Sequence, residues 1–222
     1  MSKRTSSRKS RVLIVDDHPV MRRGLSQVVT DQPDMEVCGE AASVDEALSI
    51  AEQNVPDLMI VDISLGDKNG IELIKLVRNR WPDVRMLVSS MHDESLFAER
   101  ALRAGAMGYV NKGEETGILM DAARRVLDGH IHLSPQMTTR LLNQDATTPL
   151  TDSRSPIEKL SDRELEVFRH IGEGLLTKQI AARLKLSIKT IETYRENIKA
   201  KLNLANAAEL TRHAVQWVLE QS

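Results

Sequence analysis

Short apolar runs alternate with amphipathic segments along the first half of the chain. The apolar runs have the length of strands, and the segments between them carry apolar residues at helical spacing. The predicted strands are Arg11–Val15, Glu36–Glu40, Asp57–Val61, Val84–Ser89 and Met107–Val110, and the predicted helices are Pro19–Thr30, Val44–Gln53, Gly70–Arg80, Ser95–Ala104 and Glu114–Leu127. Strands that are short and continuously apolar are typical of a parallel sheet with helices on both faces. We therefore predict an α/β domain with a five-stranded, doubly wound parallel sheet.

The second half of the chain is helical throughout. Ser161 and Glu164 have the spacing of a capping box, which predicts a helix from there to about Ile171. Three further helices are predicted: Lys178–Leu184 with Thr177 as its N-cap, Ile188–Leu202 with Ser187 as its N-cap, and Ala207–Leu219. This pattern predicts a second, all-α domain of four helices.

A stretch without periodicity separates the two halves. Residues Asn143–Pro156 gather Thr, Ser, Asp and Pro, which is the composition of a linker. Ser134 and Pro135 favour a short helix over Gln136–Leu142 before this stretch. We therefore divide the chain into a disordered basic tail (1–10), an α/β domain (11–128), a linker with a short helix (129–156) and a helical domain (157–222).

Charge differs between the two halves. The whole chain has a net charge of −2, but residues 156–222 hold 11 Lys and Arg against 9 Asp and Glu, and residues 11–155 hold 15 against 23. An acidic domain beside a mildly basic one suggests different partners, although a bias of this size does not show nucleic-acid binding. The N-terminal residues lack the apolar core of a signal peptide, and no apolar run is long enough to span a membrane. We therefore expect a cytoplasmic protein that does not contact the membrane.

Three carboxylates fall where predicted strands end. Asp16 and Asp17 follow the first strand and Asp62 follows the third, while Ser90 and Lys112 come at the ends of the fourth and fifth. In an open α/β sheet, ligands bind beyond the carboxyl ends of the strands. Converging carboxylates indicate a hard divalent cation such as Mg²⁺. Each residue alone could be a strand-end or helix-capping residue, but together they suit phosphoryl transfer onto an aspartate.

Residues 11–128 resemble the response-regulator receiver domain, which has a flavodoxin-like fold, along their whole length. The resemblance implies that Asp62 is the phosphoacceptor. It also implies that Mg²⁺ is held by Asp17, by Asp62 and by the backbone carbonyl of Ser64, with Asp16 acting through water. Asp62-Ile63-Ser64 lacks the second carboxylate of a haloacid-dehalogenase-like phosphohydrolase, which is the rival enzyme class. No enzymatic activity is therefore expected beyond slow self-dephosphorylation, tuned by Ser64 and His92.

The same resemblance assigns the switch residues of the domain. Ser90 would be the hydroxyl that turns toward the phosphoryl group, and Lys112 would pair with that group. Tyr109 would be the aromatic side chain that follows the switch inward, with half-buried strand packing as its alternative. Many receivers carry a proline where this chain has Gly66-Asp67, and another where Gly113 follows Lys112. Neither departure removes a functional group, and the complete pocket argues against a regulator that never receives phosphate.

The predicted helices 178–184 and 188–202, joined by a tight turn, form a helix-turn-helix pattern. With Ile191 at the centre of the buried face of the second helix, Arg195, Ile198 and Leu202 fall on that face. The opposite face carries Lys189, Thr193, Glu196, Asn197 and Ala200, with Glu192 on its flank. By this pattern alone, the second helix could also be an ordinary solvated surface helix.

Residues 160–202 resemble the LuxR-type DNA-binding domain in a long pattern that includes Gly174, Lys178, Ser187 and Lys189-Thr190-Ile191. Together with the receiver, this makes the chain resemble the NarL/FixJ class of two-component response regulators. The resemblance implies that the third helix of the domain enters the major groove. The candidates for base-edge contacts are Lys189, Glu192, Thr193, Glu196 and Asn197, and those for phosphate contacts are Thr177, Lys178, Thr190, Tyr194, Arg195 and Lys201. Tyr194 stands where histidine is common, so that contact is expected to differ.

The resemblance also implies partners and regulation. A sensor histidine kinase would phosphorylate Asp62, and phosphorylation would promote homodimerisation and binding to double-stranded promoter DNA. The last predicted helix carries an apolar stripe of Leu210, Ala214, Trp217 and Val218. Core packing alone explains such a stripe, but the class uses this helix as a dimer contact, so we expect a mixed role.

Overall fold

The computed structural model describes residues 8–66, 68–92, 94–147 and 156–221. The chain divides into two compact units, Met1–Ala146 and Thr147–Ser222. None of the helices in these described ranges has the length and apolar character that a membrane crossing requires.

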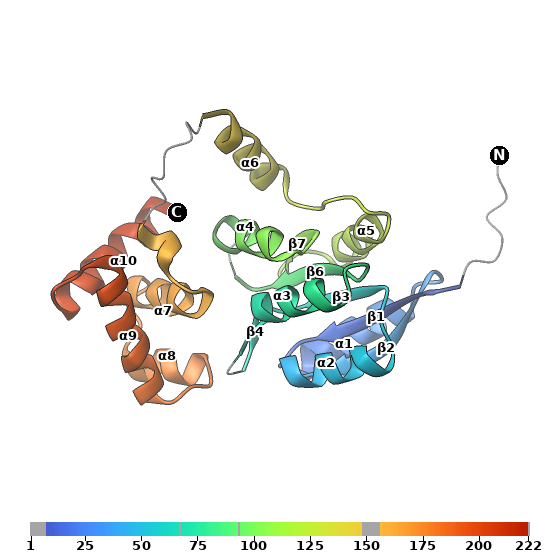
Figure 1. Ribbon diagram of the computed structural model, residues 1–222, viewed down its shortest axis with the longest axis horizontal. Coiled ribbons are helices and arrows are strands. Elements are labelled where there is room, and N and C mark those ends of the chain that lie inside the picture. The colour runs from blue at the N-terminus through green and yellow to red at the C-terminus, as the bar shows by residue number, and fades with distance from the viewer. Residues whose placement is uncertain (1–7, 67, 93, 148–155, 222) are drawn as a thin grey trace. The chain divides into compact units, whose positions relative to one another are not determined.

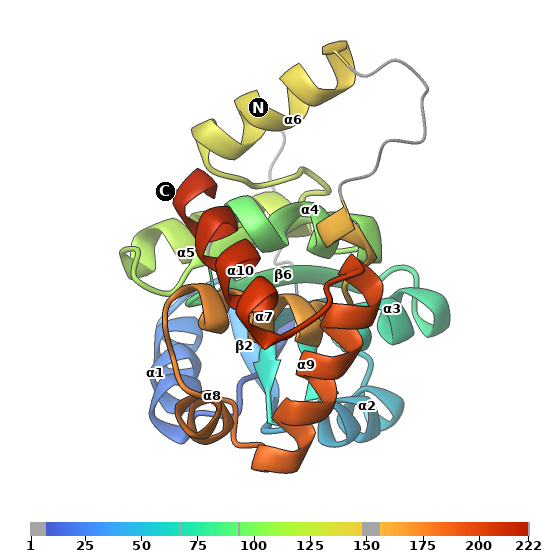
Figure 2. The same ribbon diagram turned by 90° about the vertical axis from the view of Figure 1, so that its left-hand side faces the viewer.

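The first unit contains a five-stranded parallel sheet with the order β2-β1-β3-β6-β7 (Figure 1). Its strands are β1 (Ser10–Val15), β2 (Met35–Ala41), β3 (Leu58–Val61), β6 (Arg85–Ser90) and β7 (Gly108–Asn111). Helices α1 (Pro19–Thr30) and α5 (Thr116–Leu127) cover one face, and α2 (Val44–Gln53), α3 (Gly70–Arg80) and α4 (Glu94–Ala104) cover the other (Figure 2). The predicted α/β class and five-stranded parallel sheet are confirmed.

The centre of this sheet is fully buried. Apolar side chains of β1 and β3, such as Ile14 and Ile60, pack with Val29 of α1 and Val126 of α5. Burying a side chain of this size stabilises the fold by roughly 1.5–3 kcal/mol relative to leaving it exposed. The strand order changes direction at β1, with β2 on one side and β3 on the other, and ligands of such sheets bind at this point, beyond the carboxyl ends of the strands.

Two features at the start of the unit differ from the sequence prediction. Ser10 belongs to β1, and the Arg8 guanidinium donates to the Asp57 carboxylate at 2.8 Å. The predicted disordered tail is therefore wrong for its last residues, while residues 1–7 lie outside the described residues. A small antiparallel hairpin of β4 (Ser64–Leu65) and β5 (Lys68–Asn69) was also missed, because strands of two residues leave no periodic signal.

The unit ends in a helix that is longer than predicted. Helix α6 spans Pro135–Thr147, with the Ser134 hydroxyl accepting from the Met137 N–H at 3.1 Å. Residues 143–147, which were predicted as linker, are therefore helical, and residues 148–155 lie outside the described range. Before α6, His132 forms a parallel bridge with Gly108, so the backbone extends the sheet at its β7 edge.

The second unit is helical, as predicted. It contains the short 3₁₀ helix η1 (Pro156–Lys159) and the helices α7 (Asp162–Gly172), α8 (Thr177–Arg183), α9 (Ile188–Leu202) and α10 (Ala207–Gln221). The capping box of Ser161 and Glu164 and the N-cap Ser187 are both confirmed. Thr177 is not an N-cap, because α8 already begins there. The preceding Leu176 N–H donates instead to the Gln179 side chain at 2.8 Å.

The core of this unit lies where α7 packs against α9 and α10. Ile191 and Ile198 of α9 are fully buried, as the predicted stripe requires, while Arg195 and Leu202 are half-buried. A Cβ atom on Gly172 would lie 2.3 Å from the Ala214 carbonyl oxygen, so only glycine permits this approach of α7 to α10. The core part of the predicted α10 stripe is thus confirmed at Leu210 and Ala214, which are both buried.

Candidate functional site

An acidic pocket lies where the central strands of the sheet end. The Asp62 N–H donates to the Val15 carbonyl at 2.9 Å, which fixes Asp62 at the end of β3, next to β1. The Lys112 N–H donates to the Ser90 carbonyl at 2.9 Å, so the last residues of β6 and the residue after β7 are joined in the same way. These backbone hydrogen bonds extend the sheet beyond its strands, and they hold the predicted residues Asp62, Ser90 and Lys112 on the same edge of the sheet.

Lys112 bridges two of the buried carboxylates. Its Nζ lies 2.5 Å from Asp62 Oδ2 and 2.7 Å from Asp16 Oδ2, and all three side chains are at most 4% exposed. Burial raises the pKa of Asp62, as does the Asp16 carboxylate, against the opposing effect of the Lys112 ammonium. Burial alone would lower the pKa of Lys112, but Asp62 and Asp16 outweigh it and raise that pKa. Lys112 is thus held as a fixed cation beside Asp62.

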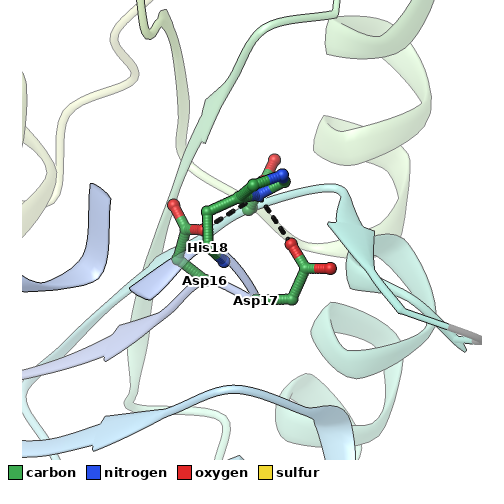
Figure 3. Close-up of side chains that lie close together, drawn as sticks. Asp16, Asp17 and His18 are labelled. Atoms are coloured by element: carbon green, nitrogen blue, oxygen red, sulfur yellow. Dashed lines mark hydrogen bonds and ion pairs between the residues drawn. The ribbon is translucent and has the colours of Figure 1, made fainter. Parts of the chain in front are cut away.

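The acidic cluster can hold a cation. One ligand atom from each of Asp16, Asp17, His18 and Asp62 lies within 4.8 Å of the others. Figure 3 shows the His18 ring joined to both neighbouring aspartates, with its Nδ1 2.7 Å from Asp17 Oδ1. Asp62 Oδ1 is buried and makes no hydrogen bond of ordinary geometry with any described residue. A buried carboxylate oxygen without a donor is costly, and a metal ion would satisfy it.

The backbone around Asp62 is fixed by a close approach of α3. The Gly70 N–H donates to the Ile63 carbonyl at 2.7 Å, and Asn69 caps α3 by accepting from the Ile71 N–H at 2.8 Å. A Cβ atom on Gly70 would lie 2.0 Å from the Asp62 carbonyl oxygen. The sequence therefore needs glycine at position 70 to let the first turn of α3 close against the loop that carries Asp62.

The predicted switch residues are connected through His92. Ser90 is fully buried, and its hydroxyl accepts from the His92 N–H at 3.4 Å. Tyr109 is 2% exposed, and its hydroxyl donates to the His92 carbonyl at 2.9 Å. Ser64, two residues after Asp62, is hydrogen-bonded through its hydroxyl to the His92 ring at 2.9 Å. The loop that carries His92 is thus tied to Ser64 in β4, to Ser90 at the end of β6 and to Tyr109 in β7.

The exposed face of α9 carries the predicted base-edge candidates. Lys189, Glu192, Thr193, Glu196 and Asn197 are all exposed, opposite the buried Ile191 and Ile198. Glu196 forms an ion pair with Lys199 at 2.9 Å, and the Thr193 hydroxyl donates to the Lys189 carbonyl at 3.0 Å. The α9 surface is therefore polar and only partly basic.

The predicted phosphate-contacting residues differ from one another in their exposure to solvent. Lys178 is exposed, whereas Thr177, Thr190, Tyr194 and Arg195 are half-buried. The Thr190 and Ser187 hydroxyls lie 2.7 Å apart at the start of α9. Lys201 donates to the buried Glu164 carboxylate at 2.6 Å, so its charge is already compensated within the domain.

Sequence reasoning missed His18, although it directly follows Asp17. It was missed because the sequence does not show the direction of the His18 ring, and only the structure places that ring against the Asp16 and Asp17 carboxylates. The connection of Tyr109 to His92 was also missed, because the two residues are far apart in the chain and only the fold joins them.

Two family models match the chain. Residues 12–124 match the response regulator receiver domain, and residues 158–214 match the bacterial regulatory proteins of the luxR family. The chain is 36% identical over 211 residues to the oxygen regulatory protein NreC of Staphylococcus carnosus, covering 93% of this chain and 97% of that protein. It is 38% identical over 201 residues to a putative transcriptional regulator of Pseudomonas aeruginosa, covering 90% and 95%.

Solved structures agree with this assignment. The structure of RcsB from Salmonella enterica serovar Typhimurium, bound to promoter rprA in the presence of phosphomimetic BeF3⁻, has a TM-score of 0.59. It is 26% identical, covering 94% of this chain and 99% of RcsB.

A receiver sheet with an acidic cluster suited to a divalent cation, followed by a helix-turn-helix, defines a regulator rather than an enzyme. The chain belongs to the two-component response regulators that bind DNA through a LuxR-type helix-turn-helix. This confirms the predicted class and its function in transcription regulation.

Proposed function

We propose that Asp62 accepts a phosphoryl group from the phosphohistidine of a sensor histidine kinase. The observation that carries this proposal is the buried contact of Lys112 Nζ with Asp62 Oδ2, while Asp62 Oδ1 has no hydrogen bond of ordinary geometry with the described residues. The Asp62 carboxylate can therefore attack phosphorus, with the phosphohistidine nitrogen as the leaving group, while Lys112 neutralises charge on Oδ2. Ser90 and Tyr109 would report the new phosphoryl group to the His92 loop.

The cation at this pocket is proposed to be Mg²⁺. Asp17 and Asp62 would hold it together with the backbone carbonyl of Ser64, and Asp16 would act through water. The donor set is predominantly carboxylate oxygen, which fits a hard cation. Bound Mg²⁺ supplies charge neutralisation for phosphoryl oxygens, and the protein supplies the in-line position of Asp62.

The proposed response to phosphorylation is dimerisation and tighter binding to promoter DNA. RcsB has been solved as dimers on DNA, and α10 of this chain leaves Leu219 71% and Val215 37% exposed beside its buried stripe. We assign base-edge contacts to Lys189, Glu192, Thr193, Glu196 and Asn197, because they are exposed on one face of α9. Backbone contacts are assigned to Thr177, Lys178, Thr190, Tyr194 and Arg195, with Lys201 as the weakest candidate.

We also propose boundaries for the two domains. The receiver domain would span residues 11–128 and the DNA-binding domain residues 157–222, with residues 129–156 between them. A protein with these partners would work in the cytoplasm, where the kinase domain and the chromosome are both accessible.

Mass spectrometry tests the central assignment. Incubation of the full chain with acetyl phosphate and Mg²⁺ should add one phosphoryl group, and fragmentation should place it on Asp62. Asp62→Asn should abolish the adduct, while Asp57→Asn, an aspartate before β3 that pairs with Arg8, should keep it. An adduct of undiminished yield in Asp62→Asn would refute the assignment.

A further inference from the structure

His18 lies in the acidic pocket but has no part in the function proposed above. It is the N-cap residue of α1, its side chain makes no capping hydrogen bond, and the ring is 54% exposed. Its own N–H donates to Asp16 Oδ1 at 2.8 Å, which anchors the residue over the pocket. The ring then turns back so that Nδ1 lies 2.7 Å from Asp17 Oδ1 and 3.5 Å from Asp16 Oδ1 (Figure 3).

The geometry allows one ion to reach the ring and the carboxylates together. The four ligand atoms of Asp16, Asp17, His18 and Asp62 lie within 4.8 Å of one another. Two ligands on opposite sides of a dication with bonds of 2.1 Å are about 4.2 Å apart. Small rotations of these side chains would therefore bring oxygen and nitrogen donors onto one ion. The buried Asp62 Oδ1, without an ordinary hydrogen bond among the described residues, points to a ligand at this place.

A nitrogen donor changes which ions a site prefers. Carboxylate and water oxygens suit Mg²⁺, whereas imidazole favours first-row transition dications. We propose that His18 is a nitrogen ligand in this pocket and that it makes the pocket bind dications such as Co²⁺ and Mn²⁺ more tightly than Mg²⁺. This inference rests on the proposed function, because it requires that the pocket holds a divalent cation.

The alternative is that His18 only orients Asp17 through the close contact of its Nδ1 with Asp17 Oδ1. The two possibilities differ in their metal dependence. Loss of an orienting group weakens every metal that Asp17 binds, typically by 10–100-fold. Loss of a nitrogen ligand weakens transition dications and spares Mg²⁺, which gains little from imidazole.

Metal titrations of the full chain separate these cases. Affinities for Mg²⁺ and Co²⁺ would be measured for the wild type, for His18→Ala and for His130→Ala, an exposed histidine after α5 that serves as the matched control. We expect His18→Ala to lower the Co²⁺ affinity by roughly 10–100-fold with little change for Mg²⁺, and His130→Ala to change neither. A paramagnetically shifted imidazole N–H signal in the Co²⁺ protein should disappear in His18→Ala.

Two results would overturn the inference. Equal losses for both metals in His18→Ala would make His18 an orienting residue, and no loss would make it a bystander. If the wild type bound neither Mg²⁺ nor Co²⁺, or if Asp17→Asn left both metal affinities unchanged, this pocket would not be a divalent-cation site. That last result would refute the proposed function along with this inference, and so the two failures are distinguishable.

A second inference comes from the segment that follows α5. The His132 N–H donates to the Met107 carbonyl at 2.9 Å, and the Tyr109 N–H donates to the His132 carbonyl at 3.0 Å, so this segment extends the sheet. At the start of α6, the Ser134 N–H donates to Glu94 Oε1 at 2.9 Å, and the Arg140 side chain donates to the Ser95 carbonyl at 3.2 Å. We call residues 132–140 the linker clasp.

The linker clasp contacts the two elements that bear the switch residues. Glu94 begins α4, directly after the loop of His92, and its carboxylate lies near the N-termini of both α4 and α6, where helix dipoles favour negative charge. Tyr109 contacts the His92 carbonyl through its hydroxyl and the His132 carbonyl through its N–H. A shift of the His92 loop toward the pocket would therefore move the attachment at Glu94 and Ser95 and would break the hydrogen bond of the Tyr109 hydroxyl.

We infer that the clasp is released when the pocket is phosphorylated, so that α6 becomes free at its N-terminal end. This step also rests on the proposed function. Amide hydrogen exchange on the full chain would test it, with and without beryllofluoride and Mg²⁺. We expect beryllofluoride to protect peptides around Asp62 and Ser90 and to increase exchange over residues 132–147.

Glu94→Gln should loosen the clasp without beryllofluoride. It replaces the carboxylate that accepts from the Ser134 N–H by a neutral amide oxygen, and the weaker hydrogen bond corresponds to roughly tenfold faster exchange over the clasp. Glu99→Gln is the matched control, since Glu99 lies on the same helix but pairs with Arg103. Protection of the pocket with no change over the clasp would overturn this inference alone, and so would an unchanged clasp in Glu94→Gln. No protection of the pocket would refute the proposed function with it.

Discussion

Lys201 is the residue for which sequence and structure give the sharpest opposing expectations. From sequence it is a candidate DNA phosphate contact, whereas in the structure its ammonium donates to Glu164 Oε2 at 2.6 Å. Glu164 is 4% exposed, and the same Oε2 accepts from the Ser161 N–H at 2.6 Å in the capping box of α7. Burial raises the pKa of Glu164, but Lys201 and Ser161 outweigh this effect and lower it. The pair therefore ties the end of α9 to the start of α7.

Lys201→Ala should consequently destabilise the DNA-binding domain. A hydrogen bond to a charged group contributes about 1.5–3 kcal/mol. Because Lys201 itself is 40% exposed, solvent screening reduces the loss to about 1–2 kcal/mol. For a domain of this size, each kcal/mol lowers Tm by about 4–8 °C. A double-mutant cycle with Glu164→Gln, followed by thermal unfolding, measures the coupling between the two residues.

DNA binding distinguishes this account from a phosphate contact. A phosphate contact contributes about −0.9 to the slope of log K against log salt concentration. We expect Lys201→Ala to leave that slope unchanged, and Lys178→Ala, at an exposed lysine assigned to the DNA backbone, to reduce it. A slope reduced by about one unit in Lys201→Ala, with an unchanged Tm, would refute the structural reasoning.

Three further predictions follow from buried contacts. Gly70→Ala should destabilise the receiver by at least about 1–3 kcal/mol and reduce phosphorylation of Asp62, because the new Cβ would overlap the Asp62 carbonyl oxygen at 2.0 Å; chemical denaturation and phosphoryl incorporation would measure this, and normal values for both would contradict it. Arg163→Met should cost about 3–5 kcal/mol, since it removes the cation that lies 2.7 Å from the fully buried Glu166 carboxylate, whereas Arg163→Met with Glu166→Leu should recover much of the loss. Burial lowers the pKa of His170 despite its contact with Glu173, so the unfolded chain binds a proton more readily than the native one. Stability should therefore fall as pH decreases through the ordinary histidine pKa of 6.5, and a pH series of unfolding free energies in which His170→Leu kept the same slope would exclude this group as the cause.

Local patterns predicted most of the elements. The bounds of α2 and α3 agree with the sequence prediction, because their apolar spacing is regular and Ser43 and Asn69 cap them through their side chains. The hairpin of β4 and β5 could not be predicted, since it depends on how the loop after Asp62 folds back. Helix α6 continues to Thr147 although the composition of residues 143–147 is typical of a linker. Composition indicates only a weak conformational preference, which neighbouring structure can outweigh.

The pocket was predictable from the position of its residues at strand ends, but its contacts were not. Asp62 and Lys112 were expected together because parallel strands end on one side. The pairing of Lys112 with both Asp16 and Asp62, and the return of the His18 ring onto Asp17, depend on side-chain positions that no local pattern contains. The same holds for Lys201, because residues 37 positions apart meet only when α7 packs against α9.

The charges of the pocket connect cation binding to phosphorylation. Asp16, Asp17 and Asp62 supply three negative charges and Lys112 one positive charge, which leaves an excess of two negative charges. Two like charges 4 Å apart repel by about 4 kcal/mol at the effective dielectric constant near a protein surface. An incoming phosphoryl group adds further negative charge, so without a cation it meets repulsion from carboxylates on two sides. A divalent ion cancels the excess of two, and the phosphoryl oxygens then become its additional ligands. The carboxylates that make the pocket unfavourable for phosphate alone therefore make it favourable for phosphate with a dication, and phosphorylation should depend on the cation even with the most reactive donor.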